Sequence, residues 1–235
     1  MVFFDGGGDP RLQPLIFLQV PFADAWFGRV EAAGAIQGND GTVSGQLGNV
    51  LLGAGRIWDL KAFGGVELLG AFVVPSATAE GEGDRVALQR SERLRGLSRW
   101  WLFAPDQPAW VVRVRHASVP GEGVRLQWQG APALAWNTRR SEALFGLSGS
   151  VRASVRRGPA ELGVAFEGVM RVNDRAGTVG QLSVEPDVRF RWPDLWGPGA
   201  GPYAELRLRI NLDPPAGPSF DGGVYGLACR VGSRF

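Results

Sequence analysis

The chain has 235 residues, enough for one sizeable domain and too few for two comfortable ones. Apolar residues make up 45% of it, and no stretch approaches the roughly 18–20 uninterrupted apolar residues of a membrane-spanning helix. A helical membrane protein is therefore excluded. The formal net charge is only +2, and no basic stripe is interleaved with aromatic residues, so we expect no nucleic-acid partner. The single cysteine, Cys229, excludes an internal disulfide.

The first half of the chain has a weak strand pattern. Residues 1–11 are expected to be a flexible lead-in, and residues 12–235 a single domain. Strands are expected within residues 12–22, 26–37, 43–56, 63–74 and 94–103, where many small residues blur the alternation of apolar and polar side chains. The long polar segment 75–92 is expected to be a surface loop.

The second half has a clear period of two. In residues 143–156, one face carries Phe145, Leu147 and Val151, and the other carries Ser148, Arg152 and Ser154. The same scheme recurs in residues 110–115, 124–129, 161–172, 182–192, 205–212 and 225–235. Most connections are too short for a parallel crossover, so the strands are expected to pair as antiparallel hairpins. Their number comes to about twelve.

Strand length and aromatic residues favour a membrane barrel over a soluble β-sandwich. Residues 143–156 run without a break, whereas strands of soluble domains usually have about five or six residues. A tilted membrane strand needs about 9–11 residues. The apolar faces also carry aromatic residues of the kind that gather at membrane interfaces, namely Trp110, Trp128, Trp192, Tyr225 and Phe235. We therefore predict an all-β fold, an antiparallel transmembrane β-barrel of about 12 strands.

The last strand resembles the C-terminal targeting signature of bacterial outer-membrane β-barrels. Tyr225, Leu227, Cys229, Val231 and the terminal Phe235 share one face, although Ser233 interrupts the series. That family's signature likewise ends on an aromatic residue with apolar residues at alternate positions before it. The resemblance implies the bacterial outer membrane as location and its lipid bilayer as partner. We expect both chain termini on the periplasmic side.

The polar faces of the predicted strands would line the interior of such a barrel. They carry Arg113, Arg115, Arg125, Arg152, Arg156, Arg171, Arg189, Arg191, Arg207, Arg209, Arg230 and Arg234, together with Glu161, Glu167, Glu185, Asp187 and Glu205. One interpretation is that these charges pair across strands and fill the interior. The other is a pore that prefers anions, because rings of arginine attract them. We expect a small passive channel for ions or small polar or anionic solutes, with a filled structural or complex-forming barrel as the alternative.

Enzyme activity is not expected, although one candidate pair exists. His116 and Ser118 would lie on the same, lipid-facing side of a strand, as in outer-membrane lipid hydrolases. A nucleophilic serine needs a base held by a third group, and only Glu122 is nearby in sequence. A histidine at the membrane–water interface is the preferred interpretation. One histidine and one cysteine do not form a usual zinc site, so no metal or cofactor is expected. A soluble sandwich or lipocalin-like binding protein remains a further alternative.

Overall fold

The computed structural model is almost entirely β-structure. It describes residues 2–4, 11–39, 42–77, 88, 99–121, 123–139, 141–173, 177–192, 195, 201–213 and 225–234. The strands are β1 (Val2–Phe4), β2 (Arg11–Leu12), β3 (Leu15–Ala23), β4 (Trp26–Asn39), β5 (Thr42–Asp59), β6 (Gly65–Val74), β7 (Ala109–Gly121), β8 (Val124–Asn137), β9 (Glu142–Arg157), β10 (Ala160–Asn173), β11 (Gly177–Arg191), β12 (Gly201–Asn211) and β13 (Tyr225–Arg234). Two short 3-10 helices are η1 (Lys61–Phe63) and η2 (Trp100–Leu102). No described helix has the length and apolar character needed to cross a membrane.

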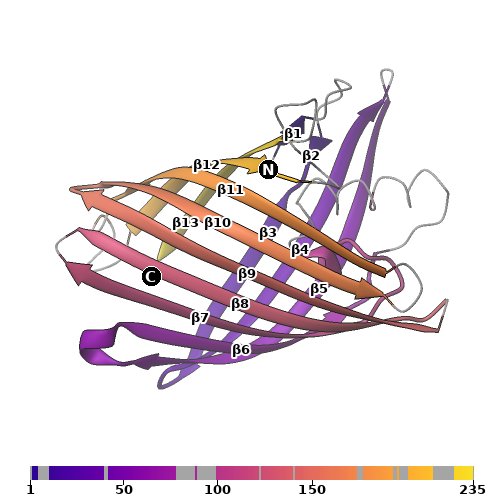
Figure 1. Cartoon of the computed structure of the whole chain (residues 1–235), viewed down its shortest axis with the longest axis horizontal. Coiled ribbons are helices and arrows are strands. Elements are labelled where there is room, and N and C mark those ends of the chain that lie inside the picture. Colours follow the sequence, from indigo (N-terminus) through magenta and orange to yellow (C-terminus); the bar gives the residue numbers. More distant parts are fainter. Residues whose placement is uncertain are drawn as a thin grey trace.

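All strands belong to one curled antiparallel sheet (Figure 1). From β3 to β13, each strand pairs with the next along the chain, so the sheet is a continuous series of hairpins. Eleven strands, β3 to β13, have nine or more residues, which confirms the prediction of an all-β antiparallel fold with long strands. The strands β7 to β11 face the viewer in Figure 1, and β3 to β5 pass behind them.

The two faces of the sheet differ sharply in polarity. The inner face, defined as the face whose side chains are buried within the curled sheet, carries charged residues such as Arg152, Glu161 and Asp187. The outer face carries exposed large apolar residues such as Val151, Leu162 and Phe166. The side chains of a strand alternate between faces, so the period of two in the sequence becomes a polar inside and an apolar outside. A soluble sandwich or lipocalin-like carrier would bury the apolar face, so this distribution does not favour that alternative.

The two ends of the curled sheet have different connections. We call one the turn end, where residues 24–25, 60–64, 122–123, 158–159 and 192–200 join consecutive strands. It lies on the left in Figure 1, where β7, β9 and β11 end. The other is the plug end, where the connection between β6 and β7 runs from residue 75 to residue 108. The longest connection therefore leaves from the plug end, where residues 40–41, 138–141, 174–176 and 212–224 also join consecutive strands.

Part of the long connection folds into the interior of the sheet and forms the plug, which we define as residues 99–104. Trp100, Trp101, Leu102 and Phe103 are all buried, and they join a cluster with Ala77 and Leu88 of the same connection. The prediction of a strand over residues 94–103 is wrong for residues 99–103, which contain η2, and residues 94–98 lie outside the described residues. The prediction of a surface loop over residues 75–92 is wrong at Ala77 and Leu88, which are buried.

Two short strands lie within the first 12 residues. Val2–Phe4 form β1 and pair with Tyr225–Leu227 at the start of β13. Arg11–Leu12 form β2, which pairs with β1 on one side and with β4 on the other. β1 therefore lies beside the start of β13 near the plug end, whereas β13 runs on to the turn end. The expectation that both termini lie on the same side is wrong for these described residues.

Candidate functional site

The charged residues predicted to line an interior share the inner face wherever the structure describes their side chains. Arg113, Arg152, Glu161, Glu185, Asp187, Glu205 and Arg209 are buried, and Arg115, Arg125, Arg156, Glu167, Arg171, Arg189, Arg191, Arg207 and Arg230 are partly buried. The side chain of Arg234 lies outside the described residues. Strand alternation explains this gathering, because charges two residues apart point to the same face.

One ion-pair network runs along β10, β11 and β12. Arg209 contacts Glu167 at 2.9 Å and Glu185 at 3.1 Å. Arg207 then joins Glu185 at 2.8 Å to Glu205 at 2.7 Å. Arg189 closes the series with a hydrogen bond of 2.8 Å from its Nε to Glu205. Positive and negative groups alternate along this chain, which offsets much of the cost of burying each charge.

A second network is centred on Arg152 of β9. Its guanidinium donates two hydrogen bonds to Asp187, of 2.8 and 2.6 Å, and one of 2.7 Å to Glu161. Glu161 also contacts Arg191 at 3.1 Å and Arg125 at 3.9 Å. The two-pronged contact with Asp187 is the geometry in which arginine and carboxylate bind most strongly.

A third group, the Glu31 cluster, was not predicted from the sequence. Glu31 is 1% exposed and contacts Arg29 of β4 at 2.6 Å, Arg99 of the plug at 3.1 Å and Arg113 of β7 at 3.1 Å. Phe27, Arg29, Glu31 and Ala33 share one strand face, so the two charges at alternate positions were the available signal. Arg99 gave no such signal because it lies outside a strand.

The plug is held by contacts with the inner face. Asn49 of β5 is fully buried and donates hydrogen bonds to the carbonyl oxygens of Trp101, at 2.8 Å, and Ala104, at 2.7 Å. Its own side-chain oxygen accepts a hydrogen bond of 2.9 Å from the Ala77 amide. Trp100 packs on Gly146, where an added Cβ would lie 2.6 Å from the indole nitrogen. The guanidinium of Arg171 lies 5.8 Å from the centre of the Trp100 ring.

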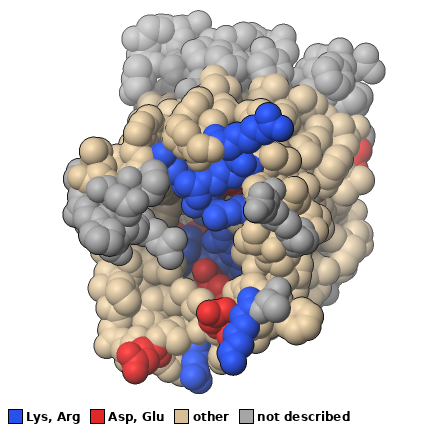
Figure 2. Space-filling view, turned by 90° about the vertical axis from the view of Figure 1, so that its left-hand side faces the viewer, with Lys and Arg blue, Asp and Glu red and all other residues tan. Residues whose placement is uncertain are grey.

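The turn end is hollowed between the strands. Figure 2 looks at this end and shows Lys and Arg side chains gathered around and inside a hollow, with acidic side chains further down. Arg125, next to the start of β8, and Arg191, at the end of β11, lie on the inner face at this end. The interior is therefore reached from the turn end past arginine side chains, and the plug lies toward the other end.

The predicted membrane-facing aromatic residues lie on the outer face where they are described. Trp110 is 65% exposed, and Trp128 and Trp192 are each nearly half exposed. The side chain of Tyr225 and the whole of Phe235 lie outside the described residues. Phe72 and Trp110 pack together on this face, with ring centres 4.9 Å apart.

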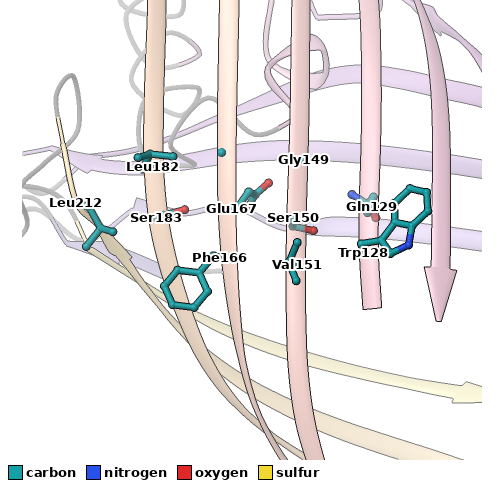
Figure 3. A pocket seen from close by; sticks show the side chains of 11 residues that line it. Trp128, Gln129, Gly149, Ser150, Val151, Phe166, Glu167, Leu182, Ser183 and Leu212 are labelled. Carbon is teal, nitrogen blue, oxygen red and sulfur yellow. The ribbon is translucent and has the colours of Figure 1, made fainter. Parts of the chain in front are cut away.

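A pocket of about 430 Å³ lies in the wall formed by β8 to β11 (Figure 3). Its apolar members, Trp128, Val151, Phe166, Leu182 and Leu212, are all exposed on the outer face. Gly149 and Gly168 are paired in adjacent strands between them and leave the wall without side chains at that point. The lining also includes Gln129, Ser150, Glu167 and Ser183 of the inner face, so the pocket reaches residues of both faces at this point of the wall.

His116 and Ser118 do not form a catalytic arrangement with a third group in the part of the chain that the structure describes. The His116 Nε2 lies 2.8 Å from the carbonyl oxygen of Phe63, and its ring stacks on Trp128 at 5.8 Å between centres. Glu122 lies outside the described residues. The described residues contain no group of three or more His, Cys, Asp and Glu side chains placed to hold a metal ion.

Comparison with known proteins adds no family to these observations: no family model, curated protein or solved structure matches the chain significantly.

Proposed function

We propose that the chain is a closed β-barrel of the bacterial outer membrane. The observation that supports this most directly is the apolar outer face, which has exposed leucine, valine, phenylalanine and tryptophan residues on strand after strand. In water, exposed apolar surface costs about 25 cal/mol per Å², so a face of this size needs an apolar environment. Strands such as β9, with 16 residues, are long enough to cross a bilayer at a tilt.

Pairing at the first strands supports closure of the sheet into a barrel. β13 pairs with β1, β1 with β2, and β2 with β4, so a path of hydrogen-bonded strands returns to the beginning of the sheet. Farther toward the turn end, Arg29 and Arg230 lie over the ring of Phe17, 5.2 and 6.0 Å from its centre. A side chain of β13 thus reaches a side chain of β3 across the junction.

The position of the longest connection supports an orientation in the membrane. Outer-membrane barrels have short periplasmic turns and longer extracellular loops. The turn end, with links such as residues 158–159, would then face the periplasm, and the plug end, with residues 75–108, the outside. The apolar outer face between these ends would contact lipid.

Within this barrel, we propose a small gated channel that prefers anions. The arginine-lined hollow at the turn end supports entry of negatively charged solutes, because rings of arginine attract them. The buried plug supports a closed resting state, in which conduction requires the plug to move. The filled structural barrel is the second candidate, and the ion-pair networks that line the interior favour it.

Conductance of the folded protein in planar bilayers tests both candidates. We expect rare openings from the wild type and many more from Asn49→Ala, which removes the hydrogen bonds to residues 77, 101 and 104. The control Ser148→Ala removes one buried hydrogen bond between wall strands, to Ala131, and should behave like the wild type. Openings should select for chloride over potassium.

Three results separate the parts of this proposal. Silence from both the wild type and Asn49→Ala would eliminate the channel and leave the filled barrel. Equal activity of Asn49→Ala and Ser148→Ala would eliminate the plug as the gate. A protein that stays monodisperse in water without detergent, and shows no shift in gel migration on boiling, would eliminate the membrane barrel itself.

A further inference from the structure

The Glu31 cluster carries more positive charge than its carboxylate can neutralise. Glu31 is buried and contacts Arg29, Arg99 and Arg113, each at 3.1 Å or less. Three guanidinium groups around one carboxylate leave a net charge of about two, since arginine stays protonated in proteins. Uncompensated charge in a partly desolvated interior is costly, so the cluster favours a further anion.

Arg113 has an unused donor within this cluster. It is 7% exposed, and its Nη1 donates to Glu31 at 3.1 Å. Its Nη2 is buried and has no hydrogen-bond partner among the described residues. A buried guanidinium donor without a partner costs free energy, and an anion oxygen would satisfy it.

Arg115 adds a fourth guanidinium on the same face of β7. It lies directly across from Glu67 of β6 in the strand pairing, and it forms no ion pair within the described part of the chain. It is also close enough to Arg29, Arg152 and Arg189 to be repelled by their charge. Glu67 is also close enough to Arg113, on the same strand as Arg115, to interact with its charge.

We propose that Arg29, Arg99, Arg113 and Arg115 form a binding site for a doubly charged oxyanion of the phosphate type. Guanidinium groups present paired donors that match the oxygens of such an anion. The ligand is a free phosphate or a small soluble solute that carries one, and it enters from the arginine-lined hollow at the turn end. This site deepens the proposed function, because it names a solute class, but its occupancy requires only a folded barrel and not an open channel.

The position of Arg99 links the site to the plug. Arg29 and Arg113 belong to the wall, whereas Arg99 belongs to the plug and reaches the same carboxylate. An anion bound by all of them adds a contact between wall and plug. Bound phosphate should therefore stabilise the closed arrangement and reduce channel openings.

Calorimetric titration of the folded protein in detergent tests the site. The probes are inorganic phosphate and glycerol phosphate, at mildly alkaline pH and constant ionic strength set with sodium chloride. We expect saturable binding of one phosphate per chain. Arg115→Gln should weaken it by about tenfold or more through loss of one charge. Glu67→Gln should strengthen it by a similar factor, because it removes the neighbouring negative charge.

The control is Arg125→Gln, which removes an interior arginine of the Glu161 network and should leave phosphate affinity within about threefold. Binding of inorganic phosphate alone would assign the site to the free ion, and tighter binding of glycerol phosphate would assign it to a phosphorylated solute. Absence of saturable binding to the folded wild type, or wild-type affinity in Arg115→Gln, would overturn the proposal. If Arg115→Gln does not fold, unchanged affinity in Glu67→Gln overturns it.

The result of the phosphate titration can be distinguished from the result of the conductance measurement. Phosphate binding without conductance would keep the site and eliminate the channel. Conductance without phosphate binding would keep the channel and eliminate the site.

Discussion

The first half of the sheet, β4 to β8, and the second half, β9 to β12, fill the same interior with different chemistry. Near the plug end, the inner positions of β4 to β8 carry small apolar residues, such as Ala33, Ala71, Ala109 and Ala133, that surround the plug. The inner positions of β9 to β12 carry mainly long charged and polar residues, such as Arg152, Glu185 and Arg207, that pair with one another. The outer face is apolar in both halves.

This difference shows that the size and charge of an inner side chain depend on what fills the space beside it. Protein interiors are packed nearly as densely as organic crystals, so a strand that contacts Trp100 or Phe103 has room only for a small side chain. The parts of β9 to β12 that do not contact the plug fill the same space with the long side chains of arginine and glutamate. In the second half, ion pairs therefore hold most inner side chains in place, where hydrophobic packing does so in the first half.

Among the variants that test this comparison, Arg152→Met should cause the largest loss in the free energy of unfolding. The substitution leaves Asp187 and Glu161 buried without their shared partner, at a cost of about 3–5 kcal/mol in the free energy of unfolding. The matched control is Arg139→Met, which removes a surface ion pair with Asp106 and should cost about 0–1 kcal/mol. Urea unfolding in detergent micelles, followed by tryptophan fluorescence, measures both. Equal losses would mean that the interior network is hydrated and contributes little.

The charged half of the sheet was largely predictable from the sequence. In β9 to β12, the apolar residues lie at alternate positions with charged or polar residues between them, so each face keeps one chemistry along its length. The partners of each arginine were not predictable. They depend on which strands are adjacent and on their register, as for Arg209, which reaches Glu167 across 42 residues of sequence.

The plug half was less predictable, for a physical reason. In β8, the inward residues Ala131, Ala133 and Ala135 alternate with outward residues that include Leu134 and Trp136. Both faces of the strand are therefore apolar there, and the sequence shows no alternation of apolar and polar residues. The plug sequence Trp100-Trp101-Leu102-Phe103 is a short apolar run, and such a run is compatible with either a strand or a buried segment. Only the burial of these residues against Asn49 and Gly146 distinguishes the two.

A smaller loss of stability should come from Gly146→Ala, which probes the packing of the plug against β9. A Cβ at this position would lie 2.6 Å from the indole nitrogen of Trp100, so Trp100 must move. We expect a loss of about 1–3 kcal/mol in unfolding free energy, as for other overpacked cores. Gly130→Ala is the control, because nothing lies within 4 Å of its Cβ on the outer face. It should change stability by no more than about 0.5 kcal/mol.

The two glycine variants also differ in their expected conductance. Displacement of Trp100 should increase channel openings in Gly146→Ala and leave those of Gly130→Ala at the wild-type level. A stable Gly146→Ala protein with unchanged conductance would show that the plug accommodates the added methyl group without moving.

Ser118→Ala, on the outer face near the turn end, should have the smallest effect on stability and no effect on lipid hydrolysis. His116 Nε2 interacts with the carbonyl oxygen of Phe63, and its ring packs on Trp128, so the histidine is held by the wall itself. A base for Ser118 would need an acidic or amide group behind the imidazole, and the described contacts of His116 provide a backbone carbonyl in that place. We therefore expect Ser118→Ala to leave phospholipid hydrolysis in vesicles at the background level of the wild type, with unfolding free energy changed by less than about 0.5 kcal/mol. Measurable hydrolysis by the wild type that disappears in Ser118→Ala would instead assign a catalytic role to the outer face, and the charged interior would then be structural.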